Sequence, residues 1–188
     1  PPLAVAVGPG PPARLLVHLP ATARPAETVE LRAALVDGRG NRAPVRSEAR
    51  IELEWEDGRV LEARLVGPGE DAWSWSVGAG EGGTRRATAR WLDSDGEVLL
   101  EASSNPMRVS TARRVLWADL QGHSSLSDGT GEPEQWFAYA REVGALDLVA
   151  LTDHDHWGLR PIDEHPELWQ RILDAADAAD VPGRFLAL

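Results

Sequence analysis

Two short clusters of histidine and aspartate carry most of the chemistry that this sequence could perform. His123 and Asp128 form the first cluster, and His154 with its neighbours Asp153 and His156 forms the second. Imidazole nitrogens and carboxylate oxygens together bind zinc, manganese or iron, and a metal-bound water is a nucleophile near neutral pH. The chain has no cysteine, so a metal site must use these ligand types. We therefore expect His123, Asp128 and His154 to hold a divalent cation, unless both clusters are ordinary solvated loops.

Four nearby residues could assist such a site. Gln121 and His123 point to the same side of an extended segment, so both could reach one ion. Asp119 and Asp153 could orient the histidines through hydrogen bonds, as carboxylates do beside metal ligands. His156 could bind a substrate or replace a ligand. The residue types leave open which of these side chains touch the ion and which only support it.

Two residues after the second cluster could recognise an anion. Arg160 carries a guanidinium that pairs readily with phosphate or carboxylate groups, and Trp157 lies three residues before it. An ordinary surface loop explains both residues equally well. Arg160 is therefore the candidate substrate-binding residue of the sequence.

The elements that must position the two clusters are predicted to alternate between strand and helix. Apolar segments at 115–120 and 146–151 predict strands that end just before the clusters, and 184–188 predicts a third. Helices are predicted at 133–143 and 167–179. Parallel strands joined by helices gather their functional residues at the carboxyl ends of the strands, so both clusters are expected to open onto one site.

The first part of the chain, residues 1–112, has a different pattern. About seven short segments alternate apolar and polar residues, as half-buried antiparallel strands do. Turn signals such as Asp57-Gly58 and Asp95-Gly96 separate them. This spacing predicts an immunoglobulin-like antiparallel β-sandwich over residues 1–112, followed by a second domain over 113–188.

Four tryptophans of the first part have two possible roles. If exposed, they could stack on sugars, which would make the sandwich a carbohydrate-binding domain. If buried, they would form its core, and we favour this interpretation because aromatic side chains most often serve cores. These residues are Trp55, Trp73, Trp75 and Trp91.

The overall charge argues against a nucleic-acid partner. With 30 acidic and 19 basic side chains the formal net charge is −11, whereas surfaces that bind nucleic acid are basic. No run of about 18 apolar residues is present, so we expect no membrane span. The chain starts at Pro1 and not at methionine, which indicates a piece of a longer protein whose location stays open.

The two clusters resemble the first two motifs of the PHP (polymerase and histidinol phosphatase) superfamily. Residues 119–124, Asp-Leu-Gln-Gly-His-Ser, with Ser-Asp-Gly at 127–129, resemble a motif usually written D-L-H-x-H-S with S-D-G after it. Residues 152–154, Thr-Asp-His, resemble the second motif. Residues 104–109 and the β-rich first part are similar to one uncharacterised PHP-like family. The resemblance covers about residues 100–188.

This resemblance implies a (β/α)7 barrel that holds two or three divalent ions, commonly zinc, manganese or iron. It implies that His123, Asp128 and His154 are ligands, and that Gln121 stands where the family has a histidine. Because the chain ends at Leu188, with its third strand, it also implies that the barrel is incomplete and lacks later ligands. Uncovered faces of such a barrel would favour self-association.

The sequence as a whole predicts an α+β chain in two parts. Its first expected function is metal-dependent hydrolysis of a small-molecule phosphoester by a metal-activated water, with residues 1–188 alone inactive because ligands are missing. The alternatives are a non-catalytic binding or scaffold protein with a degenerate metal site, and a carbohydrate-binding β-sandwich. Metal content separates the first two of these functions.

Overall fold

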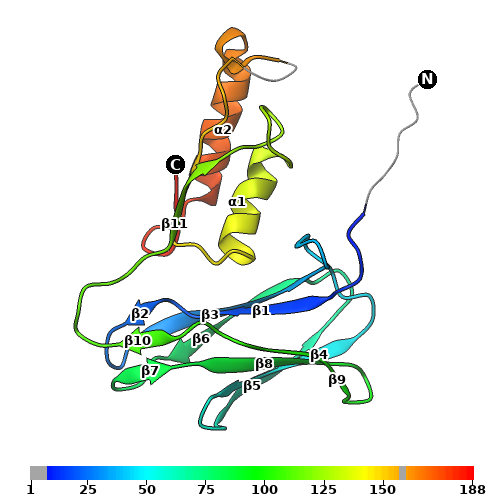
Figure 1. Ribbon diagram of the computed structural model, residues 1–188, viewed down its shortest axis with the longest axis vertical. Helices are drawn as coiled ribbons and strands as arrows, with labels where there is room; N and C mark the ends of the chain where they lie inside the picture. Colours follow the sequence, from blue (N-terminus) through cyan, green and yellow to red (C-terminus); the bar gives the residue numbers. More distant parts are fainter. Residues whose placement is uncertain (1–7, 157–159) are drawn as a thin grey trace. The chain divides into compact units, whose positions relative to one another are not determined.

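A computed structural model describes residues 8–156 and 160–188 of the chain (Figure 1). The chain divides into two compact units, Pro1–Arg113 and Arg114–Leu188. The first unit consists of strands, and both α-helices lie in the second. Among the described residues, no helix has the length and apolar character needed to cross a membrane.

The first unit is a β-sandwich of two antiparallel sheets that share one core. The two sheets have the strand orders β1-β3-β6 and β5-β4-β8-β9, and a small third sheet has the order β2-β10-β7. The strands are β1 (Arg14–His18), β2 (Thr22–Ala23), β3 (Thr28–Val36), β4 (Ala49–Trp55), β5 (Val60–Val66), β6 (Ala72–Gly78), β7 (Gly83–Arg85), β8 (Ala87–Leu92), β9 (Val98–Ser103) and β10 (Met107–Val109). Residues of β4 and β6 alternate between buried and more exposed positions, which confirms the predicted period of two and shows which face points inward.

Tryptophans fill the centre of this sandwich. Trp55, Trp73 and Trp75 are buried, and Trp91 is half-buried against the same core. Trp75 and Trp73 lie opposite Leu31 and Ala33 in the pairing of β6 with β3. The interpretation of these indoles as core residues is therefore confirmed, and the rings of Trp55, Trp73 and Trp75 are packed inside the unit.

One buried carboxylate holds the turn that follows β3. Asp37 accepts hydrogen bonds from the Asn41 side chain at 2.9 Å and from the backbone amides of Gly10, Arg39 and Asn41 at 2.8–3.0 Å. The side chain of Asn41, with the three backbone amides, keeps the pKa of Asp37 well below its ordinary value. The folded protein thus stabilises the ionised carboxylate of Asp37 more than the unfolded chain does.

Asp37 should therefore contribute to the pH dependence of stability. A depressed folded-state pKa gives a contribution that is complete above the unfolded pKa of about 3.9 and fades as the pH falls below it. We expect Asp37→Asn to lower the urea concentration at the midpoint of unfolding at pH 7. The difference in midpoint between this variant and the wild type should become smaller below about pH 4. Urea unfolding at both pH values measures this, with the exposed Asp95→Asn as control. A difference in urea midpoint that stays constant with pH would contradict the role of the Asp37 charge.

The second unit is a three-stranded parallel sheet with two helices. The strands β11 (Ala118–Gly122), β12 (Leu148–Leu151) and β13 (Leu186–Ala187) are paired in that order. The helices α1 (Pro133–Glu142) and α2 (Pro166–Ala179) connect them, with a short 3-10 helix, η1 (Ile162–Glu164), before α2. Phe137 of α1, Ile172 of α2, Val149 of β12 and Phe185 form the core between helices and sheet.

The local sequence explains where α1 begins. Pro133 occupies the first turn, where a missing amide hydrogen costs nothing. Glu132 and Gln135 form a capping box, in which each side chain bonds to the other residue's backbone amide. Predicted bounds of both helices agree with the structure to within one residue at each end.

The predicted fold class is wrong in its second part. Among the described residues, strands make up 39% and helices 15%, so this part of the chain is mainly β and not the predicted α+β. The described part of the second unit is an open sheet of three strands, β11, β12 and β13, and does not form a (β/α)7 barrel. The barrel was expected from the PHP resemblance alone. Runs of apolar residues predict strands and their burial, but they carry no information on whether a sheet closes.

Candidate metal centre

The two clusters lie at the same edge of the sheet in the second unit. β11 ends at Gly122 and is followed by the loop that carries His123 and Asp128, and β12 ends at Leu151, just before His154. The strands are parallel neighbours, with Gly122 opposite Leu151. Their carboxyl ends therefore bring the two loops together, and Thr152 reinforces this contact by donating its backbone amide to the Gly122 carbonyl at 2.7 Å.

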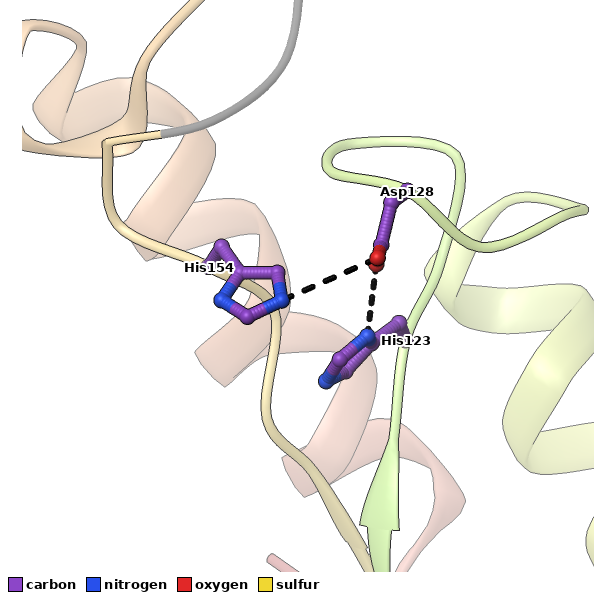
Figure 2. Close-up of side chains that lie close together, drawn as sticks. All are labelled: His123, Asp128 and His154. Carbon is purple, nitrogen blue, oxygen red and sulfur yellow. Dashed lines mark hydrogen bonds and ion pairs between the residues drawn. The ribbon is translucent and has the colours of Figure 1, made fainter.

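His123, Asp128 and His154 converge at this edge (Figure 2). His123 Nδ1 lies 2.6 Å from Asp128 Oδ1, and His154 Nε2 lies 3.7 Å from Asp128 Oδ2. The two imidazole rings meet edge to face, with centroids 4.6 Å apart. One possible ligand atom from each residue lies within 4.8 Å of the others. Two imidazoles and one carboxylate at these distances suit a single divalent ion after small side-chain adjustments.

Asp128 is held in its charged form. Partial burial pushes the pKa of this carboxyl upwards, but the hydrogen bond from His123 and the two nearby imidazoles outweigh that effect. The pKa of Asp128 therefore lies below its ordinary value. A carboxylate that is already ionised near neutral pH can bind a cation without first losing a proton.

Two glycines give the first loop its shape. A Cβ on Gly129 would lie 1.9 Å from the carbonyl oxygen of His123, so this close approach of two backbone segments requires glycine. A Cβ on Gly122 would lie 1.9 Å from the ring of Trp136, which packs over that position from α1. The glycine content of the sequence signalled a loop here, but not these particular close approaches.

Two of the supporting residues, Asp119 and Gln121, lie on β11 away from the ligand group. Both are exposed, and Asp119 accepts a hydrogen bond from the backbone amide of Gln121 at 3.1 Å. Among the described residues, the group that could hold an ion contains neither of them. The structure thus brings three of the predicted candidates together, and Asp119 and Gln121 are not part of that group.

The remaining predicted residues surround the second loop. His156 forms an ion pair with Asp155, and its ring centroid is 6.4 Å from that of His154. Arg160 pairs with Glu167 at the start of α2 and lies 3.3 Å from His165 Nδ1. Trp157 falls outside the described residues.

Asp153 contacts two residues that sequence reasoning missed. Its carboxylate accepts hydrogen bonds from Ser124, at the backbone amide and the hydroxyl, and from the hydroxyl of Ser127. Ser124 is fully buried. Both serines lie in the motif segments 119–124 and 127–129, but residue type alone gave neither of them a role.

Comparisons with known proteins find no family for the chain. No family model matches it, and no curated protein matches it. Solved structures that resemble it include SoxY, a sulfur carrier protein from Chlorobium limicola, with 12% identity, 51% of this chain and 78% of that chain covered, and a TM-score of 0.38. The PKD domain of an M14-like peptidase from a Thermoplasmatales archaeon has 17% identity over 55% of this chain and 100% of that chain, with a TM-score of 0.39.

A third similar structure is the CARDB domain of a Pyrococcus furiosus protein, solved in complex with di-metal ions. It has 13% identity, covers 53% of this chain and 93% of that chain, and has a TM-score of 0.37. These neighbours are β-sandwich domains, and no PHP protein is found with them. The predicted membership of the PHP superfamily is therefore wrong. Two short motifs at strand ends specify too few positions to define a family. What stands is a β-sandwich unit, followed along the chain by a unit with a candidate metal site.

Proposed function

We propose that this protein binds a divalent metal ion through His123, Asp128 and His154, and that the ion serves binding or scaffolding and not turnover. The observation that carries the proposal is the convergence of three ligand atoms within 4.8 Å from two neighbouring strand ends. Ionised Asp128 supplies negative charge, and the side chains of His123 and His154 are half-buried beside it.

The donor set supports zinc as the ion of choice, with manganese or iron(II) as weaker binders. Magnesium and calcium prefer all-oxygen sites, whereas imidazole suits the later transition metals. We expect zinc to bind with higher affinity than manganese, and calcium not to compete. Competition titrations with a chromogenic zinc chelator measure this order. Equal competition by calcium and zinc would contradict binding through the two imidazoles.

Binding without turnover is favoured by the number of ions that the site could hold. Phosphoester hydrolysis often uses two metal ions about 3.5–4 Å apart, which clamp the attacking and leaving oxygens. Within residues 8–156 and 160–188, a single group of three possible ligands comes together. One ion with three protein ligands fits a binding site without a second metal.

Metal-dependent hydrolysis is the second candidate, and one observation favours it. Three protein ligands leave at least one coordination position for water, as catalytic zinc sites do, and the Asp128 side chain is 49% exposed, so that solvent reaches the site. The test is release of p-nitrophenol from p-nitrophenyl phosphate and its bis ester, with zinc, manganese or iron(II) added. We expect no metal-dependent release above that of His123→Ala. If the wild-type protein releases p-nitrophenol with added metal and His123→Ala does not, the function is hydrolysis and not binding alone.

A further inference from the structure

A single carboxylate ties together the backbone on both sides of the metal site. Asp153 Oδ1 accepts hydrogen bonds from the Ser124 backbone amide at 2.8 Å and from Ser127 Oγ at 2.5 Å. Its other oxygen, Oδ2, accepts a hydrogen bond from Ser124 Oγ at 2.7 Å. Ser124 Oγ in turn accepts the backbone amide of Leu126 at 3.2 Å. Asp153 thus links the loop after β12 to two residues of the loop after β11, Ser124 and Ser127.

The members of this network are the chain neighbours of the three candidate ligands. Ser124 follows His123, Ser127 precedes Asp128, and Asp153 precedes His154. Fixing these neighbours fixes the Cα positions from which each ligand side chain extends. Because Ser124 is fully buried and Asp153 is half-buried, the bonds are shielded from competing water.

We propose that Asp153 is a positioning residue that preorganises His123, Asp128 and His154 for metal binding, acting through Ser124 and Ser127. This inference rests on the proposed metal binding and adds the residue that sets its affinity. Without the network, each loop would lose conformational freedom when the ion binds, and that loss would weaken binding. Mutation of a residue that holds a metal ligand in place typically lowers metal affinity 10- to 100-fold.

The test compares Asp153→Asn and Ser127→Ala with Ser125→Ala. Ser125 is an exposed serine of the same loop whose hydroxyl donates to Glu132, outside the network. We expect both network variants to weaken zinc affinity by about tenfold or more, and Ser125→Ala to leave it unchanged. Ser127→Ala removes one hydrogen bond only, so it remains informative if Asp153→Asn fails to fold.

A spectroscopic measurement separates positioning from general destabilisation. Cobalt(II) in place of zinc gives visible d–d bands that report coordination geometry, and we expect the two network variants to change these bands while circular dichroism shows folded protein. Wild-type zinc affinity and cobalt spectra in both variants would overturn the role of Asp153 and leave the metal site intact. Absence of zinc binding by the wild-type chain would overturn the proposed function and this inference together.

Discussion

Replacing His123 or His154 by alanine is expected to lower zinc affinity by about 100-fold or more, which is beyond the usual effect of losing a residue that only supports a ligand. Each substitution removes one of the three side chains whose ligand atoms converge, and the remaining two cannot fill the vacated coordination position. Asp128→Ala should weaken binding as well, because it removes the only carboxylate of the group. Isothermal titration of the metal-free proteins with zinc measures all three variants.

Two other histidines provide controls for this prediction. His165→Ala removes an imidazole that pairs with Glu167 at the start of α2, so zinc affinity should not change. His156→Ala tests whether the neighbouring imidazole replaces a ligand, and we expect at most a small change because His156 pairs with Asp155. A loss of affinity in His156→Ala as large as that in His154→Ala would show that the ligand set has been assigned wrongly.

Gly129→Ala is expected to disrupt the first loop and abolish tight metal binding. The new Cβ would lie 1.9 Å from the His123 carbonyl oxygen and 2.3 Å from its carbonyl carbon. Both neighbours are backbone atoms, so relief requires the loop itself to move, and His123 and Asp128 would move with it. Overpacking of this kind costs about 1–3 kcal/mol. We therefore expect a lower melting temperature for the second unit together with lost zinc binding.

The matched control for this variant is Gly38→Ala. A Cβ at Gly38 meets no atom within 4 Å, and its backbone does not adopt a positive φ. Thermal unfolding followed by circular dichroism, with and without zinc, compares the two variants. If Gly129→Ala keeps wild-type zinc affinity, the close approach of Gly129 to His123 does not determine the geometry of the site.

The sequence predicted the sandwich strands well because burial on one face leaves a clear period of two. Trp73 and Trp75, two residues apart, were expected to share a face, and both point into the core. The strand before the first cluster was predicted too early, at 115–120, whereas β11 spans Ala118–Gly122. The apolar side chains of Val115 and Leu116 caused this shift because they suggested the start of a buried strand. In the structure both side chains are exposed.

A simple rule about strand ends predicted the candidate site. The sequence did not identify the family correctly, and it did not predict the hydrogen bonds that support the site. His-rich clusters directly after predicted strands implied neighbouring loops, and the pairing of β11 with β12 has that geometry. The network of Asp153 with Ser124 and Ser127 depends on how two loops fold, which residue types do not encode. Gln121 drew attention through its i, i+2 spacing from His123 and through the PHP resemblance, and the structure leaves it exposed on β11.

The most direct test of metal binding is the zinc content of the protein. The wild-type chain and a His123→Ala/His154→Ala double variant are loaded with zinc, dialysed against metal-free buffer and analysed by elemental mass spectrometry. The proposed site predicts about one zinc ion per wild-type chain and close to none in the double variant. Equal zinc content in the two proteins, or no zinc in either, would contradict a metal site formed by His123, Asp128 and His154.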